Sequence, residues 1–527
     1  MLKVEHILVV GGGSAGWMSA ATFCRSFPNK KITVIESPNV PTVSVGESTL
    51  AYIKTWLHFL GVSDEEFMSE VDASYKLSIK FTDFYKKDYG SFHYPFGEPS
   101  RKICPIGPEA WYIKKVLHPD TPLDDYSRCY FPQMALIEKN KLNKDPKGLL
   151  FEHGYHFEHA VAFHFDAAKF GLFLREKYCK PRGVKHISAE VKSVITDNDG
   201  VKEIILDDGT SISADLYVDC TGWKSLLLGE SLKEPFISYS DRLVNNKAWA
   251  TKIPYIDKEK EVEPYTNCTA INNGWVWNIP LWSRIGTGYV YSDKYISKED
   301  ALIEFKQYLK SDKMTIKADR NVEEFEFNDI TMRVGIHERI WVKNVIAIGL
   351  AAGFIEPLES NGLFTVNDFL SRACQVLDRE IVSQMDIDLV NNLCKKGFDA
   401  FANFIYIHYL LSQRTDTEYW RDLKKRSVTH LIDGNENENM FAKYMNTKVI
   451  GGSYEFGTGI HCISMGLNYN PMTINKLKSE EHLLRLSNYK RGLELQEKAW
   501  DEFKQMSNYI ADNSPTLYEY LKENIYS

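Results

Sequence analysis

The sequence predicts an α/β protein that combines a Rossmann-type nucleotide-binding fold, β-sheet insertions and a mainly helical C-terminal region. Three observations favour this class. The apolar run His6–Val10 precedes a glycine-rich turn and a helix of small residues, which is the order of a βαβ unit. Residues 270–292 are rich in β-forming side chains. After about Asn361 the pattern becomes mainly helical.

The individual elements follow from apolar runs bounded by turn residues. The first unit consists of a strand at His6–Val10, a helix at Trp17–Phe23 and a strand at Lys31–Ile35 that ends on Glu36. The other predicted elements are a helix over Ala167–Tyr178, a strand over Gly183–Ile187, a hairpin that begins with Val201–Leu206, strands over Asp215–Gly222 and Asn344–Gly349, and an amphipathic helix over His482–Ala499. No repeat or Pro/Gly-rich linker divides the chain, so the sequence marks no sharp domain boundary.

Composition restricts the class of partner. The 527 residues carry a net charge of -8, so we expect neither nucleic acid nor an anionic membrane surface as a partner. We find no signal peptide and no run of about 18 apolar residues, so no transmembrane helix is expected. The nine cysteines are scattered without C-x-x-C, and the histidines lack metal-binding spacing. We therefore expect a cytoplasmic protein with no metal site.

A nucleotide-binding fingerprint follows the first strand. The run 11–16 fits G-x-G-x-x-G through Gly11, Gly13 and Gly16, which permit a tight turn, close approach of backbone to a pyrophosphate, and helix–strand packing. Glu36 ends the second strand, where a carboxylate can accept hydrogen bonds from the ribose hydroxyls. An ordinary glycine turn is the alternative, but strand, helix, second strand and acid all stand where a dinucleotide requires them.

Further segments favour flavin over a nicotinamide nucleotide. Glu36 would repel the extra phosphate of NADP. The stretch Asp215–Gly222 resembles the D-x-x-x-x-x-T-G sequence of flavin enzymes, and Ile346–Leu350 resembles their last strand. No second fingerprint is present, so the electrons are expected from another protein.

The ordered set of motifs resembles flavin-dependent halogenases of the tryptophan-halogenase type over about the first 400 residues. The most informative motif is W-x-W-x-I-P at Trp275–Pro280. The other matching segments are Gly11–Trp17, Val45–Glu47, Tyr75–Lys76, Ile79–Phe81, Phe163–Asp166, Asp219–Gly222, Gly286–Val290 and Phe354–Gly362. The resemblance implies a flavin monooxygenase-like FAD fold, with an FAD-binding halogenase module at 1–380 and a mainly helical substrate-side region at 381–527.

The same resemblance implies a cofactor and its binding residues. The cofactor is FAD, used as FADH2 from a separate flavin reductase, together with O2 and a chloride, bromide or iodide ion. The implied FAD-binding residues are Gly11, Gly13, Ser14, Ala15, Gly16, Trp17, Glu36, Gly46, Glu47, Val191, Leu350 and Leu363. The halide is expected on the backbone N–H groups of Asn361 and Gly362, because an anion needs donors and a tight turn supplies them.

Two residues take catalytic positions in this resemblance. Lys76 is implied to hold hypohalous acid beside the substrate, as a hydrogen-bond donor or as a haloamine. Glu359 is implied to polarise the halogen species or to remove the proton from the halogenated ring, while Glu356 is structural or shares that role. Without the resemblance, Lys76 would be interpreted as an ordinary solvated lysine.

The remaining implied residues separate or line the two reaction sites. Ser360 links the flavin and substrate sides, and Trp275, Trp277 and Pro280 form a wall between them. The two tryptophans lie two apart and therefore face the same side of a strand, although a W-x-W pair also occurs as a plain core stripe. Tyr94 and Phe96 are expected to form one side of an aromatic clamp.

The substrate is predicted only as a class. The family's Tyr-Tyr pair and tryptophan-rich stretch are missing around Gly451–Gly457, so an indole, phenol or other electron-rich ring is preferred over free tryptophan. Two other functions stay open at this stage: a flavin-dependent aromatic monooxygenase, and a non-catalytic flavin-binding protein. A homo-oligomer is compatible with the sequence.

Overall fold

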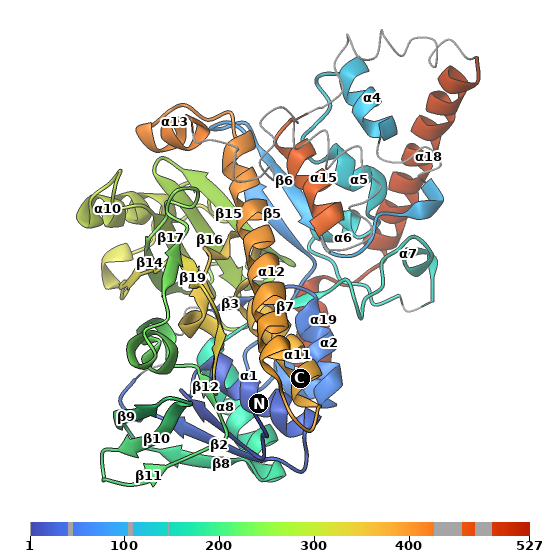
Figure 1. The fold of residues 1–527 in the computed structure, drawn as a ribbon. Helices are drawn as coiled ribbons and strands as arrows, with labels where there is room; N and C mark the ends of the chain where they lie inside the picture. The colour runs from blue at the N-terminus through green and yellow to red at the C-terminus, as the bar shows by residue number, and fades with distance from the viewer. Residues whose placement is uncertain (1, 41–45, 104–108, 146, 426–455, 470–486) are drawn as a thin grey trace.

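A computed structural model describes residues 2–40, 46–103, 109–145, 147–425, 456–469 and 487–527 (Figure 1). A six-stranded sheet carries the nucleotide-binding end of the molecule. It is parallel except at β20, and its central strands are buried apolar runs. In spatial order its strands are β20 (Trp341–Val342), β21 (Val345–Ala347), β12 (Leu216–Asp219), β1 (His6–Val10), β2 (Lys31–Glu36) and β8 (Lys185–Ser188).

This sheet confirms the predicted α/β class. Helix α1 (Ser14–Ser26) follows β1 and packs against α11 (Gly362–Leu377), which begins near the point where the sequence becomes helical. The predicted helix over 167–178 is observed as α8 (Ala167–Phe173), continued by a π-helix over Leu174–Cys179. All predicted strands of the first unit and its neighbours are present within a few residues of their expected bounds.

A seven-stranded sheet forms the second layer and contains the W-x-W-x-I-P motif. Only its β15–β5 pair is parallel. In spatial order its strands are β18 (Asn328–Thr331), β14 (Lys247–Ile253), β17 (Ile285–Tyr291), β16 (Gly274–Pro280), β15 (Tyr265–Ile271), β5 (Ser78–Thr82) and β6 (Ser91–Pro95). Trp275 and Trp277 join the large central core, whereas Val276 packs with α10 (Lys298–Leu309) on the other face.

Three small sheets complete the β structure. Their strands are β11 (Ser211–Ile212), β10 (Gly200–Leu206) and β9 (Val191–Asp197); β13 (Phe236–Ser238), β19 (Gly335–His337) and β22 (Gly353–Phe354); and β3 (Glu47–Ser48), β7 (Ala162–Phe165) and β4 (Ser74–Lys76). The first sheet contains the predicted hairpin. The last sheet places Lys76 beside residues from two distant parts of the chain, because β7 pairs with both β3 and β4.

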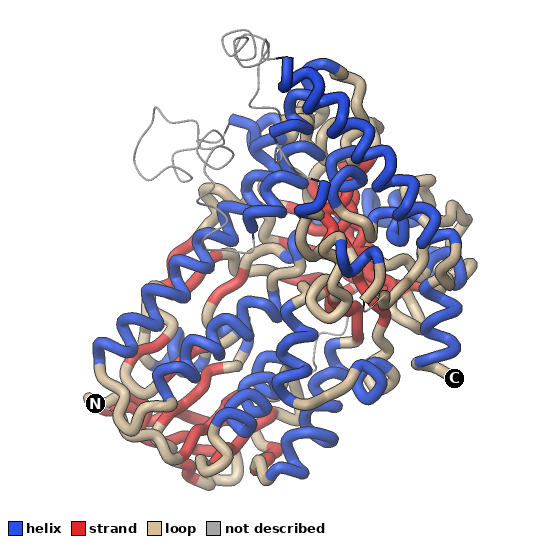
Figure 2. Tube along the Cα trace, turned by 90° about the vertical axis from the view of Figure 1, so that its right-hand side faces the viewer, coloured by secondary structure: helices blue, strands red, loops and turns tan. Residues whose placement is uncertain are grey.

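The helices lie along the flank of the sheets and at the end opposite the six-stranded sheet. The long helix α12 (Gln384–Leu411) runs the length of the molecule, and Figures 1 and 2 show it connecting the two ends. The other helices are α2 (Tyr52–Leu60), α3 (Asp64–Met68), α4 (Glu109–Leu117), α5 (Asp125–Tyr130), α6 (Met134–Glu138), α7 (Leu149–Glu152), α9 (Lys258–Glu261), α13 (Glu418–Lys425), α15 (Phe456–Gly466), α18 (Ser487–Asp512) and α19 (Leu517–Asn524).

The described C-terminal helices pack on residues from the first third of the chain. Helix α18 contacts α5 and α6, and α15 contacts β6 (Figure 1). The predicted helix over 482–499 coincides with α18 from residue 487 onward, and its first residues lie outside the described part of the chain. The predicted boundary at residue 380 stays a prediction.

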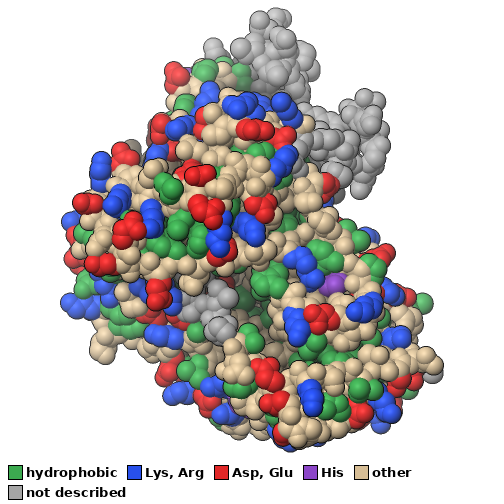
Figure 3. Space-filling view, turned by 90° about the vertical axis from the view of Figure 1, so that its left-hand side faces the viewer, with side chains coloured by type: hydrophobic (Ala, Val, Ile, Leu, Met, Phe, Trp, Pro, Cys, Tyr) green, Lys and Arg blue, Asp and Glu red, His purple; other side chains and the backbone are tan. Residues whose placement is uncertain are grey.

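Acidic and basic side chains are interspersed over the face of the molecule that Figure 3 shows. Among the described helices, none combines the length and the apolar character that crossing a membrane requires.

Candidate active site

The nucleotide fingerprint lies where β1 meets α1. Gly11 has a φ of +116°, and a Cβ at this position would meet the Cys220 carbonyl oxygen at 2.2 Å. A Cβ at Gly16 would lie 1.8 Å from the Gly11 carbonyl oxygen. At Gly13, by contrast, a Cβ would have no atom of the protein within 4 Å. The outer glycines are therefore required by the fold, and Gly13 leaves room at the helix N-terminus for a ligand.

Other predicted FAD-binding residues surround this turn. Glu36 ends β2, and its Oε2 lies 3.0 Å from Nη1 of Arg175 and 2.9 Å from Nε2 of His186. No described side chain is hydrogen-bonded to Oε1, so this oxygen is available as an acceptor for a ligand. Gly349, next to Leu350, approaches Ala15 so closely that a Cβ on it would lie 2.7 Å from the Ala15 Cβ. The sequence-distant segments at 15 and 350 are thus adjacent, as a flavin site requires.

The rest of the predicted FAD set lies on neighbouring elements. Ser14, Ala15 and Trp17 are in the first turns of α1, Val191 begins β9, and Leu363 is in the first turn of α11. Gly46 has a φ of +105° and precedes β3, and Val45 lies outside the described residues. Glu47 is half-buried, and burial together with nearby Asp166 raises the pKa of its carboxyl to about 7.

Lys76 is buried, not solvated. Its side chain is fully inaccessible, and Nζ donates hydrogen bonds of 2.8 Å to the Thr49 carbonyl oxygen and 2.8 Å to Oγ of Ser360. The ring centre of Phe96 lies 4.9 Å from Nζ. Burial lowers the pKa of Lys76 from 10.5 to about 7, against smaller opposing effects of Cys268 and Glu359. Near neutral pH this lysine is therefore a mixture of ammonium and amine, which an ordinary surface lysine is not.

Glu359 lies in the 3-10 helix Pro357–Glu359 and is 1% exposed. Burial raises the pKa of its carboxyl, while His408 and Lys76 act in the opposite direction. Nε2 of His408 lies 2.7 Å from Oε1 of Glu359, although the two groups are not aligned as a regular hydrogen bond. Nδ1 of His408 lies 3.1 Å from the Phe404 carbonyl oxygen, which fixes the proton on Nδ1.

His408 is a site residue that the sequence did not predict. It lies in the last turn of α12, is fully buried, and contacts the rings of Phe81 and Phe404. A lone histidine on a long amphipathic helix has no local signal that distinguishes it from a core residue. Only the fold shows that it meets Glu359.

Glu356 has a different environment from Glu359. Its Oε2 accepts hydrogen bonds from Tyr409 Oη at 2.6 Å, from Asn245 Nδ2 at 2.8 Å and from Trp275 Nε1 at 2.9 Å. Three donors on one oxygen hold this carboxylate in place within the core. Glu356 is thus held by three donors, whereas Glu359 contacts His408 and interacts electrostatically with Lys76.

The two tryptophans of β16 lie together, with ring centres 6.1 Å apart. Trp275 is anchored through Glu356. Trp277 covers Gly288 so closely that a Cβ on this glycine would lie 2.2 Å from the indole ring. The indole Nε1 of Trp277 is buried without a described acceptor. A buried donor without an acceptor is costly.

The predicted halide turn lies between the 3-10 helix and α11. Ser360 adopts a left-handed conformation with a φ of +58°, and Asn361 precedes the first residue of α11, Gly362. The N–H groups of a first helical turn have no acceptor within the helix. A Cβ on Gly362 would meet no atom within 4 Å, so there is open space beside these N–H groups, which are the donors that a small anion would use. Oδ1 of Asn361 is buried without a described partner, and as an acceptor it offers an anion no hydrogen bond.

The predicted aromatic clamp is partly assembled. Tyr94 packs edge-on against Phe96 and Phe404, and Gly459 of α15 approaches the Tyr94 hydroxyl. The segment around Gly451–Gly457, in which the second side of the clamp was sought, lies outside the described residues or has side chains that are not described.

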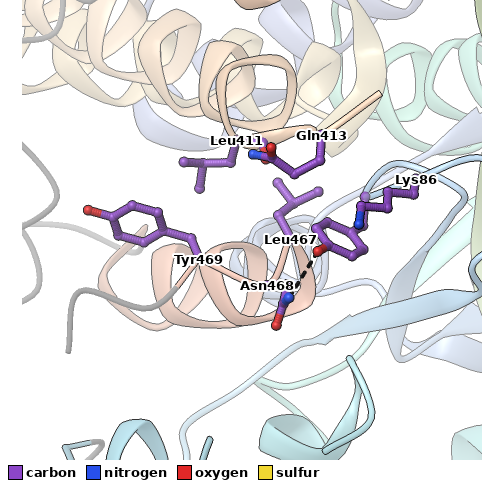
Figure 4. Close-up of a pocket in the computed structure, with 7 residues that line it drawn as sticks. Lys86, Leu411, Gln413, Leu467, Asn468 and Tyr469 are labelled. Atoms are coloured by element: carbon purple, nitrogen blue, oxygen red, sulfur yellow. Dashed lines mark hydrogen bonds between the residues drawn. The ribbon is translucent and has the colours of Figure 1, made fainter. Parts of the chain in front are cut away.

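A separate surface pocket of about 340 Å³ opens beyond the end of α12 (Figure 4). Asn468 donates a 3.0 Å hydrogen bond to Tyr85 across it. Its lining consists of Tyr85, Lys86, Leu411, Gln413, Leu467, Asn468 and Tyr469. None of the predicted site residues is among them, so this pocket is distinct from the Lys76–Glu359 site.

Comparison with known proteins adds independent information. A sequence model of the tryptophan halogenase family matches residues 6–450. The chain is 30% identical to tryptophan 7-halogenase RebH of Lentzea aerocolonigenes over 99% of both proteins. It is 34% identical to tryptophan 6-halogenase SttH of Streptomyces toxytricini, over 80% of this chain and 82% of that protein. The apo structure of VirX1 matches with a TM-score of 0.90 and 35% identity, over the full length of both chains.

Proposed function

The chain belongs to the tryptophan halogenase family and is a flavin-dependent halogenase, and from this premise we propose which residues deliver the halogen and to what. We infer that the enzyme takes FADH2 from a separate reductase and that bound reduced flavin, with O2 and halide, supplies hypohalous acid. Lys76 then holds this acid for an electron-rich aromatic substrate, and Glu359 accepts the ring proton.

The role of Lys76 rests on its burial and its pKa. With a pKa of about 7, the ammonium form donates a hydrogen bond to hypohalous acid, and the amine form reacts with it to give a haloamine and water. Either form restrains the oxidant at one point. The ring of Phe96, 4.9 Å from Nζ, provides an apolar surface for an aromatic substrate beside that point.

The role of Glu359 rests on its contact with His408. The Nδ1 proton of His408 is directed at the Phe404 carbonyl oxygen. The other ring nitrogen, Nε2, therefore faces Oε1 of Glu359 at 2.7 Å, and a proton bound by Glu359 can be shared between these two atoms. We infer that Glu359 accepts the proton that the halogenated ring must lose and that His408 stabilises it there. The three donors on Glu356 favour a positioning role for that residue.

Strand β16 and the turn before α11 lie between the proposed flavin and halide site and the proposed substrate site at Lys76. The halide is proposed at the N–H groups of Asn361 and Gly362, and the wall of Trp275, Trp277 and Pro280 keeps an organic substrate from the flavin. Ser360, which accepts from Lys76, connects the two sides. This arrangement lets a small acid pass and excludes a ring-sized molecule.

We propose an indole- or phenol-type ring as the substrate. The relatives RebH and SttH are tryptophan halogenases by name, so indole chemistry is the first choice within that class. The halogenase chemistry lies mainly in residues 1–380, and the helical region at 381–527 contributes His408 from α12 to the substrate side. A monooxygenase is disfavoured because the buried Lys76 would then have no use.

The observation that carries the proposal is the buried Lys76 beside Glu359. The test supplies FAD, a flavin reductase, NADH, O2 and bromide or chloride to the enzyme with a panel of indoles, phenols and tryptophan. We expect a halogen isotope pattern in the product by mass spectrometry, lost in Lys76→Ala and retained in Lys80→Ala. Addition of oxygen without halide dependence would identify a monooxygenase instead. An unchanged rate in Lys76→Ala would refute the role given to this lysine.

A further inference from the structure

Lys76 stands at one end of a continuous hydrogen-bonded chain. Beyond Ser360, Oγ of Ser48 lies 2.9 Å from the Ser360 hydroxyl and 2.5 Å from Oγ1 of Thr266. Oγ1 of Thr266 lies 2.9 Å from Nε2 of His164. The other ring nitrogen, Nδ1, lies 3.3 Å from Oγ of Ser74, which donates at 2.5 Å to the Pro280 carbonyl oxygen.

The last acceptor fixes the direction of every bond in this chain. A carbonyl cannot donate, so the Ser74 proton points to Pro280, and Nδ1 of His164 must carry a proton to bond Ser74. A neutral His164 protonated on Nδ1 then accepts on Nε2, so its partner Thr266 is the donor.

The directions of the remaining hydrogen bonds, from Thr266 back to Lys76, follow in turn. Each hydroxyl has one proton, so Thr266 has none left for Ser48, and Ser48 must donate to Thr266. Ser360 must in turn donate to Ser48 and can only accept from Lys76. Lys76 is thus a donor to both Ser360 and the Thr49 carbonyl, in its ammonium and its amine form alike.

We propose that His164, with Thr266 and Ser48, is a positioning group that holds Lys76 as a double donor and thereby leaves one position on its nitrogen for the halogen species. In the ammonium this third position is an N–H, and in the amine it is the lone pair. The inference deepens the proposed function, because it assumes that Lys76 receives the halogen. It assigns roles to three residues outside the catalytic pair.

The surroundings of the chain agree with a neutral His164. The ring is fully buried, and burial together with Lys76 holds its pKa well below the ordinary value. Around Lys76, the titratable groups are His164 on β7, Cys268 on β15 and Glu359 on the 3-10 helix. With Ser48 or Thr266 removed, the Ser360 hydroxyl is free to turn and donate to the lysine lone pair, which would direct that lone pair toward Ser360 and away from the third position.

The test uses Thr266→Val, which removes one hydroxyl and keeps the side-chain shape. Thr269→Val is the matched control, since Thr269 lies on the same strand, faces the other side and accepts only from Tyr308 at 3.3 Å among the described residues. We expect kcat for the aromatic substrate to fall about tenfold in Thr266→Val, with KM little changed. More hypohalous acid should also reach a small diffusible scavenger. Thr266→Ser should restore the rate.

A second measurement does not depend on turnover. Ring-nitrogen NMR of histidine-labelled protein, assigned by the signal lost in His164→Gln, should show His164 protonated on Nδ1 and bare on Nε2. A proton on Nε2 instead would overturn the proposal, and so would equal kcat and scavenger signals in Thr266→Val and Thr269→Val. If the wild type gave no halogenated product, the proposed function would fail, while the NMR result would still decide the direction of the chain.

Discussion

Keeping an ionisable lysine in the core should cost stability in a way that depends on pH. Burial lowers the pKa of Lys76 from 10.5 to about 7, so the folded state disfavours the ammonium that the unfolded chain carries. Below pH 7 both states are protonated, and the penalty is complete at about 5 kcal/mol. Between pH 7 and 10.5 the lysine must release its proton on folding, and this release costs less as the pH rises, so at pH 9 about 2 kcal/mol of the penalty remains.

Lys76→Met removes this penalty while keeping the length of the side chain. Methionine cannot donate to Thr49 and Ser360, which costs roughly 1–3 kcal/mol for each group left without a donor, but that loss does not change with pH. The free energy of unfolding of Lys76→Met minus that of wild type should therefore be about 3 kcal/mol larger at pH 6 than at pH 9, which means that the variant gains relative stability at the lower pH. Urea unfolding of the cofactor-free protein at both pH values measures this difference.

Two comparisons isolate the lysine. Lys192→Met, on the exposed surface of β9, should show no such dependence, because its side chain is solvated in both states. Comparing Lys76 with Lys76→Met in a second background that carries Glu359→Gln removes the titration of the Glu359 carboxyl from the difference. A relative stability of Lys76→Met that is equal at pH 6 and pH 9 would refute the argument that this lysine titrates near neutral pH.

Three further substitutions test other parts of the site. Glu359→Gln should lower kcat about 100-fold or more while a diffusible scavenger is still halogenated, and loss of both signals would contradict its role as a base. Gly13→Val should abolish FAD binding, measured by flavin absorbance after desalting. The urea midpoint should not change, because a Cβ at this position meets no atom of the protein within 4 Å. Retained FAD would show that the cofactor lies elsewhere. Trp275→Phe should destabilise the protein by about 1–2 kcal/mol, measured by urea unfolding, because Glu356 loses one of three donors; no change would mean that this hydrogen bond is dispensable.

The sequence predicted the fold well where local signals and chain order agree. The βαβ unit is recognisable because a buried parallel strand, a glycine turn and a helix must follow one another within about 30 residues. The segment at 270–292 was predicted from its content of β-forming side chains. The structure adds that side chains of β16 alternate between two different cores. The sequence did not predict that β5 pairs in parallel with β15, because pairing between strands so far apart in the chain has no local signature.

The candidate site was predicted through resemblance, and its geometry came from the fold. Lys76 by itself resembles any lysine on a strand, and only the structure shows its complete burial and its bond to Ser360. His408 had no signal at all. Its importance depends on a contact with Glu359 that forms only when the end of α12 lies beside the 3-10 helix.

The W-x-W-x-I-P motif acquires a broader role from these contacts. At one end of β16, the indole N–H of Trp275 holds Glu356, three residues before Glu359. At the other end, the Pro280 carbonyl sets the direction of the chain that leads through His164 to Lys76. Because the bonds in that chain join residues from 90 to 312 positions apart, no sequence pattern could have revealed it. The strand predicted as a wall between two sites therefore also connects to both residues proposed as catalytic, Lys76 and Glu359. A substitution in this strand should alter the delivery of halogen as well as its containment.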